Sequence, residues 1–377
     1  MSTELAPSAD QNTRSRHDGF SFEALVQAYF DCRRTKRNSP TSLAFEANLE
    51  HNLRTLYREL INGTYTPGQS ICFVVTRPKP REVWAADFRD RIVHHLLYNH
   101  IGPRIEATFI ADSCACIKGR GTLYAAQRLE QKARSITQNW QRPAYYLKCD
   151  LANFFVAINK SVLWEMLQAR IPSGIWRDLA HLILWHDPRQ HYRLRTPAAL
   201  LDLVPPHKRL TAQPSHLGLP IGNLSSQFFA NVYLDALDQR IKHHHRARHY
   251  IRYVDDFIIL DTSAQRLNDI LSDITEWLPA QLGANLNPRK TILQPVHRGI
   301  DFVGQVIKPH HRTTRRRTLN VALHLVAQTS PAELPVTINS YFGLLRQATK
   351  GHHDRAQLAN LARAKGFAVN RALTKAM

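Results

Sequence analysis

The pattern of apolar and polar positions is most distinctive between residues 250 and 260. Aromatic and aliphatic side chains flank two adjacent acids there, Asp255 and Asp256. Short runs rich in Ile, Val, Tyr and Phe are typical of strands, and Asp tolerates the unusual backbone angles of a tight turn. The pattern therefore predicts a β-hairpin with the acid pair at its tip. So short a motif often recurs by chance, and on its own it indicates a turn and nothing more.

A second strand is predicted for residues 145–151. Alternation along a strand puts Tyr146, Lys148 and Asp150 on one face and mainly apolar side chains on the other. We expect the apolar face to pack on helices, while the opposite face presents Asp150. The hairpin gains chemical meaning if this carboxylate, distant in sequence, faces it.

Carboxylates brought together in this way need a counter-charge. Two of them ~4 Å apart repel by about 4 kcal/mol at an effective dielectric of 20, so a proton or a cation must lie between them. Oxygen ligands suit Mg²⁺, and a pair of such ions can stabilise the attacking and leaving oxygens of a phosphoryl displacement. The sequence thus indicates a nucleotidyl-transfer site.

The rest of the chain alternates between helical and strand patterns. Apolar residues that recur every three or four positions predict helices, and Ser225 is a candidate N-cap for the helix that ends near three consecutive histidines. Those histidines, residues 243–245, cannot all face one metal, so we expect a solvated, partly cationic helix end. Helices are predicted at 42–60, 90–101, 123–133, 160–170, 175–185, 229–241 and 264–278, with helical patches at 341–345 and 358–361; strands at 70–76, 81–86 and 299–304; and a loop at 187–215.

Composition narrows the choice of partner. The 377 residues contain 50 Lys and Arg against 30 Asp and Glu, a formal net charge of +20. This excess favours a polyanionic partner, nucleic acid before membrane. The sequence shows neither an apolar run long enough to span a bilayer nor a signal peptide. Five cysteines without paired metal spacing fit reduced thiols, so we expect a cytoplasmic protein with no membrane partner.

Several basic or glycine-bearing loops could contact phosphates. The turn between the strands at 70–76 and 81–86 either is a solvated hairpin tip or grips a triphosphate. The loop at 113–122 has glycines that allow close backbone approach, although such a pattern is usually just a turn. The loop at 217–227 precedes a helix and could present N–H groups to a nucleotide. Candidate nucleic-acid contacts in the 113–122 loop and in the basic strip at 308–317 are Lys118, Arg120, Lys308, Arg312, Arg315, Arg316 and Arg317.

Taken in this order, the motifs resemble a reverse transcriptase over roughly residues 42–310. Residues 77–81 and 90–95 look like the fingers, and the palm motifs are matched at Asp150 with Phe155, at 218–222, at 253–256, at Lys290 and at 299–304. The resemblance implies an α+β, right-hand polymerase fold with fingers, a palm of antiparallel sheet packed on helices, and a helical thumb. The implied divisions are a disordered leader at 1–20, fingers with palm entry at 21–144, palm at 145–307, and basic strip with thumb at 308–377.

The same resemblance implies roles for individual residues. Asp150, Asp255 and Asp256 would be the catalytic residues and would bind two Mg²⁺ ions, with Mn²⁺ as a substitute. Phe155 would be the aromatic gate that meets the sugar 2′ position, where selectivity above ~10²-fold requires a clash. The remaining nucleotide-binding residues would be Lys79 and Arg81 at the phosphates, Ile221, Gly222 and Asn223 beside the nascent base pair and template, and Lys290 at the departing pyrophosphate.

Within that superfamily, residues 219–227 and 294–304 are most similar to the reverse transcriptases of diversity-generating retroelements. Most reverse transcriptases carry Gln where this chain has Ile221, and an aliphatic side chain cannot donate the amide hydrogen bonds of Gln. The resemblance implies a bacterial or phage enzyme for mutagenic retrohoming. It would copy a template RNA into cDNA from a primer strand and deoxynucleotides, with frequent errors opposite adenine. A small basic accessory protein is the implied partner.

Four further interpretations stay open. A group II intron-like or a phage-defence reverse transcriptase would share these motifs, although the stretch after the palm is short for an intron endonuclease module. An RNA-dependent RNA polymerase is disfavoured because Phe155 stands where ribose acceptance would favour a smaller or polar side chain. A non-catalytic RNA-binding scaffold would explain the basic charge, but the intact acids argue against it.

Overall fold

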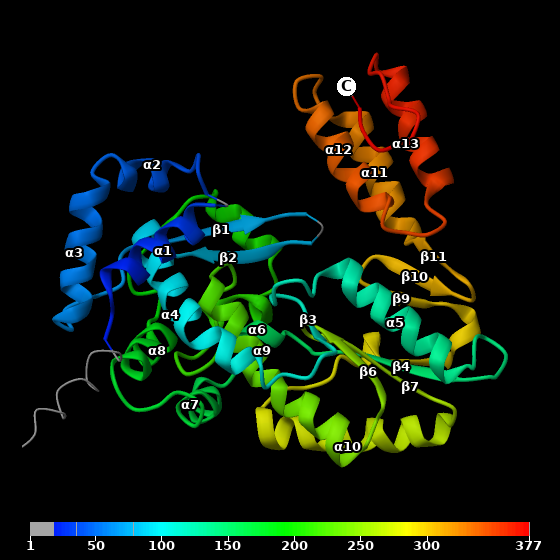
Figure 1. Ribbon diagram of the computed structural model, residues 1–377, viewed down its shortest axis with the longest axis horizontal. Helices are drawn as coiled ribbons and strands as arrows, with labels where there is room; N and C mark the ends of the chain where they lie inside the picture. The colour runs from blue at the N-terminus through cyan, green and yellow to red at the C-terminus, as the bar shows by residue number, and fades with distance from the viewer. Residues whose placement is uncertain (1–18, 35, 78, 377) are drawn as a thin grey trace, which may run out of the picture. The chain divides into compact units, whose positions relative to one another are not determined.

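The computed structural model describes residues 19–34, 36–77 and 79–376 (Figure 1). Its internal contacts divide the chain into two compact units, each built from segments far apart in sequence. Of the described residues, those up to 109 together with 153–234 and 282–284 form unit 1, and 110–152, 235–281 and 285–376 form unit 2. The boundaries expected for fingers, palm and thumb stay predictions.

The predicted leader at residues 1–20 lies outside the described residues except for Gly19 and Phe20. Phe20 is buried, and its ring meets that of Trp176 edge-on with centroids 4.7 Å apart. Phe20 therefore belongs to the core of unit 1.

Unit 1 contains a small sheet in the order β2-β1-β5. Strand β1 (Ser70–Val75) pairs antiparallel with β2 (Arg81–Ala85), as predicted from their apolar runs, and parallel with β5 (Tyr192–Leu194). Strand β5 and three short 3₁₀ turns (Ala198–Leu203, Pro206–Lys208 and Leu210–Ala212) lie in the segment predicted as a loop. The helices of unit 1 are α1 (Phe22–Arg33), α2 (Pro40–Glu46), α3 (Leu49–Ile61), α4 (Phe88–Glu106), α6 (Phe154–Ala157), α7 (Lys160–Gln168), α8 (Ile175–Trp185) and most of α9 (Leu224–Gln239).

Two local predictions in unit 1 are wrong. The helix expected at 42–60 is broken at Asn48, whose φ of −131° and ψ of 49° are not helical, so α2 and α3 are separate. Ser225 does not cap the following helix, because α9 already begins at Leu224 and Ser225 is buried inside it. Periodicity alone marks which residues face the core, and it does not locate a one-residue break.

Unit 2 is organised around a five-stranded sheet in the order β3-β6-β7-β4-β8. All neighbouring pairs are antiparallel except β3 with β6. The hairpin predicted at 250–260 is formed by β6 and β7, and the strand predicted at 145–151 lies beside it as β4. The strands are β3 (Ser113–Cys114), β4 (Tyr145–Asp150), β6 (His249–Tyr253), β7 (Asp256–Asp261) and β8 (Ile292–Pro295).

Side chains on both faces of β4 are buried, including Tyr146 on the face that the alternation assigned to Asp150. Tyr146 lies in a core cluster with apolar residues of α5 (Thr122–Ile136) and with Phe302. The opposite face carries Leu147 and Cys149, which are also fully buried. Only the Asp150 end of β4 retains polar side chains on the face that the alternation predicted.

The C-terminal part of unit 2 has its own small sheet and helical core. Strands β9 (Ile300–Phe302), β10 (Gln305–Lys308) and β11 (His311–Thr314) form an antiparallel sheet. Helices α11 (Arg316–Gln328), α12 (Leu334–Leu345) and α13 (His352–Ala364) share a separate apolar cluster, in agreement with the predicted helical patches. Helix α10 (Ala264–Leu282) lies beneath the main sheet in Figure 1. Among the described residues, no helix has the length and apolar character needed to cross a membrane.

A fully buried ion pair ties the hairpin to its surroundings. Arg252 of β6 donates from Nε and Nη2 to the two carboxylate oxygens of Asp238, at 2.8 and 2.6 Å. It also donates to Ser113 Oγ at 2.7 Å and to the backbone oxygen of Val254, in the hairpin turn, at 3.0 Å. Tyr250 donates its hydroxyl to the same Asp238 carboxylate at 2.6 Å. One guanidinium therefore joins α9, β3 and the turn that carries the acid pair.

Replacing Asp238 should destabilise this arrangement at a measurable energetic cost. Asp238→Ala leaves the Arg252 charge buried without its partner, so we expect the free energy of unfolding to fall by about 3–5 kcal/mol. The exposed Asp269 of α10 provides a matched control, for which the same substitution should change the free energy by less than about 0.5 kcal/mol. Urea denaturation of both variants measures the difference, and equal effects would contradict the structural role of the pair.

Candidate active site

Strand register brings two of the three predicted acids face to face. Asp150, the last residue of β4, is directly opposite Asp256, the first residue of β7. Directly opposed residues of antiparallel strands point to the same side with Cβ atoms about 5 Å apart. Asp256 is also opposite Tyr253 of β6, so it lies between the ends of the two strands that flank β7. The distant carboxylate that the hairpin required is therefore Asp150.

The third acid, Asp255, lies in the two-residue turn between β6 and β7. The sequence pattern assigned the unusual backbone angle of this turn to an Asp, but Val254 adopts it, with φ of 57°. A β-branched residue with positive φ is strained by roughly 1–3 kcal/mol. The buried Arg252 donates to the Val254 carbonyl and so holds the strained turn, and with it Asp255, in place.

Two lysines neutralise the opposed acids. Lys290, which follows Asn287 in a 3₁₀ turn (Pro288–Lys290), places its Nζ 2.7 Å from both carboxylate oxygens of Asp150. Lys148 places its Nζ 3.1 Å from Oδ2 of Asp256 and donates to the Asp301 backbone oxygen at 2.7 Å. The sequence predicted Lys290 near the pyrophosphate, whereas here it binds Asp150. Lys148 received no role, although strand alternation had placed it on the same face as Asp150.

The carboxylate of Asp256 is only partly compensated by its neighbours. Its Oδ1 atom is buried without a hydrogen-bond partner. Burial raises the pKa of this carboxyl to about 6, the Lys148 ammonium lowers it in part, and the nearby charges of Asp150 and Asp255 raise it further. A divalent cation would satisfy the orphaned oxygen and offset the repulsion, so the residues present fit such an ion.

The carboxylate oxygens of the three aspartates do not lie close enough together in this structure to bind one ion jointly. Within the described part of the chain, the trio of acid, histidine or cysteine ligand atoms lying within 4.8 Å of one another is His244, His245 and Asp273. Both oxygens of Asp273 already accept from Arg240, at 2.9 and 2.5 Å, and one also contacts His245 Nε2 at 2.7 Å. A cation beside that guanidinium is unfavourable, so this trio is an ion-pair cluster. The helix end that was expected to be solvated is thus attached to Asp273 through His245.

In unit 1 the predicted phosphate grip lies on the β1–β2 hairpin. Lys79 and Arg81 are both exposed at its tip, where they are available to a ligand. Phe155, the predicted gate, is half-buried on the short helix α6, and its backbone oxygen accepts from Leu219 N at 2.8 Å. The gate residue and the loop that carries Ile221 are therefore connected through the backbone.

The loop carrying Ile221, Gly222 and Asn223 is fixed to β2. Trp84 N donates to the Ile221 carbonyl at 2.7 Å, and Ala86 N donates to Asn223 Oδ1 at 3.0 Å. Gly222 has φ of 126°, and a Cβ there would lie 2.6 Å from the Trp84 oxygen. Only glycine fits between these two attachments. We name this pairing of residues 221–223 with β2 the loop latch.

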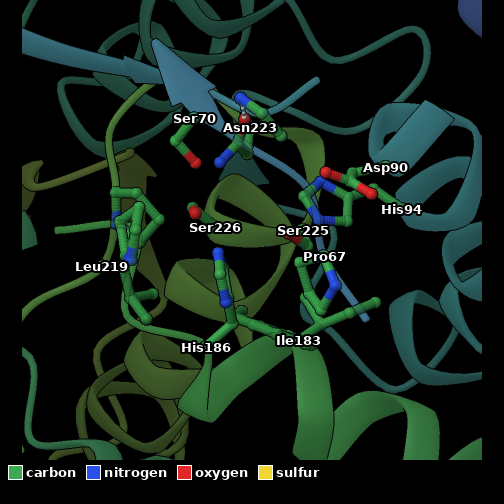
Figure 2. Close-up of a pocket in the computed structure, with 14 residues that line it drawn as sticks. Pro67, Ser70, Asp90, His94, Ile183, His186, Leu219, Asn223, Ser225 and Ser226 are labelled. Carbon is green, nitrogen blue, oxygen red and sulfur yellow. Dashed lines mark hydrogen bonds between the residues drawn. The ribbon is translucent and has the colours of Figure 1, made fainter. Parts of the chain in front are cut away.

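A pocket lined by both polar and apolar side chains shares Asn223 with the loop latch (Figure 2). Asn223, Ser225 and Ser226 line it from the start of α9, and His94 and Asp90 line it from α4. The Nδ1 atom of His94 is buried without a partner, and burial lowers the pKa of His94 to about 3, so the ring is neutral. Asp90 is held by hydroxyl and backbone N–H donors from the segment before β1, both at 2.8 Å. Beyond the glycine loop ahead of the helix, no sequence signal indicates this pocket.

The predicted nucleic-acid contacts divide into exposed and structural residues. Arg312 is a correction: it is buried, and its guanidinium binds Glu130, Gln305 and the Gln347 carbonyl at 2.7–3.0 Å, so it cannot reach a phosphate. Arg120 donates to the backbone oxygens of Ile110 and Ser113, and Arg315 pairs with Asp301. The remaining four side chains are exposed and stay candidates: Lys118, Lys308, Arg316 and Arg317.

Comparison with known families matches residues 78–307 to the reverse transcriptase (RNA-dependent DNA polymerase) family. The match covers more than half of the 377 residues and includes all three acids and Lys290. The chain therefore belongs to the reverse transcriptase family. This confirms the family-level resemblance and the α+β, right-hand polymerase class of fold.

Individual relatives are distant. The chain is 21% identical to the "Putative COX1/OXI3 intron 2 protein" of Saccharomyces cerevisiae over an alignment of 222 positions, and the match covers 44% of this chain and 24% of that protein. It thus spans about a quarter of the length of that relative.

Two telomerase structures resemble the chain at 12% identity. The Candida albicans telomerase in complex with a TWJ fragment of telomeric RNA covers 79% of this chain and 55% of its own, with a TM-score of 0.46. The apo telomerase of Candida tropicalis, truncated from its C-terminal domain, covers 65% and 55%, with a TM-score of 0.48. Neither likeness is close enough to bear on the function of this chain.

The buried charge of Asp256 predicts a pH-dependent stability difference. The pKa of about 6 in the fold lies above the ordinary value of 3.8, so the ionised carboxylate destabilises the folded state. We expect Asp256→Asn to raise the free energy of unfolding by about 1–2 kcal/mol above pH 6, a figure discounted because a quarter of the side chain is exposed. The gain should disappear as the pH falls from about 6 to about 4.

Urea denaturation across this pH range, in the presence of a chelator, measures the effect. Asp269→Asn on the exposed face of α10 is the control, and it should show no such pH dependence. A gain of equal size at every pH would mean that the buried charge is not its cause.

Proposed function

We propose that this protein is an RNA-directed DNA polymerase that copies a template RNA into cDNA. The observation that carries the proposal is the register of β4 with β7, which sets Asp150 opposite Asp256 beside the turn of Asp255. Membership of the reverse transcriptase family supplies the reaction class. Deoxynucleotides are the substrates, and the template RNA and a primer strand are the partners.

In this proposal, Asp150, Asp255 and Asp256 hold two divalent ions, Mg²⁺ or in its place Mn²⁺. Such ions, when bound, stabilise the charge on the attacking and leaving oxygens of an in-line displacement. Lys148 balances the buried charge of Asp256 and keeps it ionised near neutral pH. Lys290 is paired with Asp150 in this structure, and once that carboxylate takes another partner its ammonium becomes available to the departing pyrophosphate.

Further nucleotide contacts are proposed for the β1–β2 hairpin, Phe155 and the loop latch. Lys79 and Arg81 bind the triphosphate, for which their exposure at a hairpin tip suits them. Phe155 excludes a 2′-hydroxyl by a direct clash and so favours deoxynucleotides. The loop latch presents the side chain of Ile221 to the nascent base pair.

The proposed subtype is the diversity-generating one, in which cDNA with errors at template adenines serves mutagenic retrohoming with a small basic accessory protein. Ile221 in place of Gln supports it, because an aliphatic side chain cannot hydrogen-bond to a mismatched or matched base. The yeast intron protein supports a second candidate, a group II intron-like reverse transcriptase. A phage-defence reverse transcriptase would use the same acids, whereas a non-catalytic RNA-binding scaffold would use only the basic surface.

A primer-extension assay tests the polymerase proposal. Purified protein with a primed RNA template, Mg²⁺ and deoxynucleotides should extend the primer, and Asp255→Ala should lower the rate by about 10³-fold because an ion ligand worth several kcal/mol is lost. Asp269→Ala, which removes an exposed acid of the same unit, should retain the wild-type rate. Equal extension by the wild type and Asp255→Ala would refute the proposal, as would no extension by the wild type with its native RNA and partner.

Sequencing the cDNA tests the subtype. We expect errors concentrated at template adenines, and Ile221→Gln should reduce them about fivefold, the equivalent of one hydrogen bond of about 1 kcal/mol. Ile221→Leu, which preserves the aliphatic character on the same backbone, should leave the error spectrum unchanged. Errors spread evenly over all template bases would favour the intron-like candidate, and an unchanged spectrum in Ile221→Gln would mean that Ile221 does not set fidelity.

A further inference from the structure

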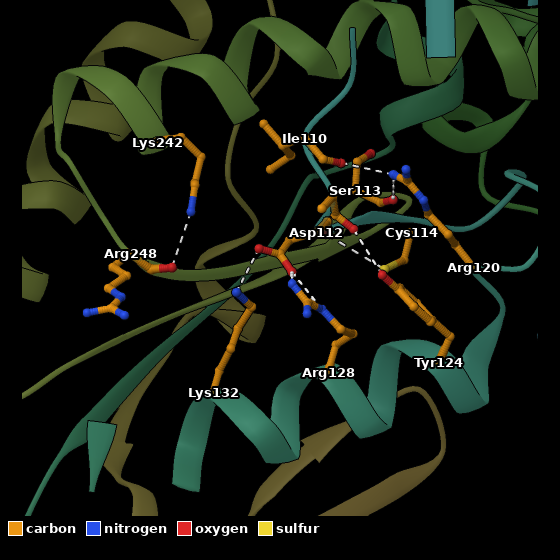
Figure 3. A network of polar contacts seen from close by, with 11 residues as sticks. Ile110, Asp112, Ser113, Cys114, Arg120, Tyr124, Arg128, Lys132, Lys242 and Arg248 are labelled. Carbon is orange, nitrogen blue, oxygen red and sulfur yellow. Dashed lines mark hydrogen bonds and ion pairs between the residues drawn. The ribbon is translucent and has the colours of Figure 1, made fainter. Parts of the chain in front are cut away.

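A basic surface lies at the end of β6 farthest from the acids. It combines Lys132 of α5 with Lys242, Arg246 and Arg248, which connect α9 to β6, and we call these four residues the strand-end patch. Lys242 donates from Nζ to the Arg248 backbone oxygen at 3.2 Å. Figure 3 shows Lys242, Arg248 and Lys132 together with Arg128 around the Asp112 network.

Among the described residues, three of the four positive charges of this patch have no carboxylate partner, and the fourth, Lys132, pairs with Asp112. The carboxylate that Lys132 contacts, Asp112, is shared with Arg128, at 2.7 Å from Lys132 and 2.6 Å from Arg128. Asp261 pairs with Arg266 at 3.2 Å. In the part of the chain that the structure describes, no carboxylate pairs with Lys242, Arg246 or Arg248.

Burial and the excess positive charge together lower the pKa of neighbouring titratable groups. Burial lowers the pKa of Lys132, and the charges of Arg128 and Lys242 lower it further against the opposing effect of Asp112. Burial also lowers the pKa of the His249 ring, and Lys132, Arg248 and Lys242 add to the effect while Asp261 opposes it. Side chains from α5, the connecting segment and β6 therefore share one positive field.

The backbone of the connecting segment is also unusual. Residues Arg240–His244 form a π-helical turn, a geometry that is rare and frequent at functional sites. Arg246 follows with φ of 52°, outside the range that a residue with a Cβ normally adopts. The nine residues 240–248 contain seven Lys, Arg or His and no acid. The chain thus maintains a strained conformation that presents consecutive basic side chains.

We propose that the strand-end patch binds the phosphate backbone of an RNA segment outside the active site. This rests on the proposed function in taking RNA as the partner. Arg248 and Asp255 are at opposite ends of β6, roughly 20 Å apart at 3.3 Å per residue, so one strand separates the two sites. RNA is favoured over an acidic protein because the exposed large apolar side chains of the described residues do not include any at 128–132 or 240–248.

The patch is tested with an RNA duplex of about 20 base pairs that has no primer end to extend. The double variant Lys242→Glu, Arg248→Glu should bind it about tenfold more weakly at ~100 mM salt, and the slope of log affinity against log salt should fall by about two. The double variant Lys242→Gln, Arg248→Gln should show the same direction with a smaller loss. Extension of a primed template of about ten base pairs at saturating concentration should keep the wild-type rate in both variants.

Arg54→Glu, Arg58→Glu on the exposed face of α3 is the matched control for net charge. An equal loss in this control, or unchanged duplex binding by both patch variants, would overturn the proposal. If the wild type bound polyglutamate more tightly than the duplex, and the patch variants lost that binding, the ligand of the patch would be an acidic protein and not RNA. A wild type that binds the duplex but extends no primer would refute the polymerase proposal and not the patch.

Discussion

The arrangement of unit 2 depends on the buried pair of Arg252 and Asp238. Taking two charges out of water is favourable only when every donor and acceptor finds a partner. Here the guanidinium binds Asp238, Ser113 and the carbonyl of Val254, and Tyr250 binds the same carboxylate. The pair therefore fixes three elements against one another at a single point. That point is one residue away from the turn that carries the proposed metal ligands.

The acids themselves illustrate why such support is needed. Opposing Asp150 and Asp256 across two strands creates repulsion, and burying Asp256 adds a desolvation cost. Lys290 and Lys148 offset the repulsion and the desolvation cost through their ion pairs with these acids. The positive φ of Val254 adds backbone strain to the turn. The proposed cation site is thus neutralised in this structure by the ammonium groups of two lysines. Release of the lysines and binding of metal ions would be coupled steps, because both compete for the same carboxylate oxygens.

The sequence predicted the helices and strands better than the breaks between them and the contacts between distant segments. Hairpin, strand β4, most helices and the family resemblance followed from alternation, periodicity and motif order, because these depend on residues close in the chain. The break at Asn48, the partners of Lys148 and the burial of Arg312 depend on contacts between distant segments. The basic strip illustrates the difference: composition marks its charge, but only the fold separates Arg312, which packs against Glu130, from exposed Arg316.

The loop latch shows how backbone constraint can isolate one side chain. Trp84 and Ala86 hold the loop on either side of Gly222, where any Cβ would meet the Trp84 carbonyl. Asn223 is buried and its side-chain oxygen accepts from Ala86 N, so only its amide N–H groups are left for another partner. Ile221 uses only its carbonyl in the latch, and its side chain can therefore vary without moving the loop. If fidelity is set anywhere in this segment, it is set by the chemistry of that one side chain.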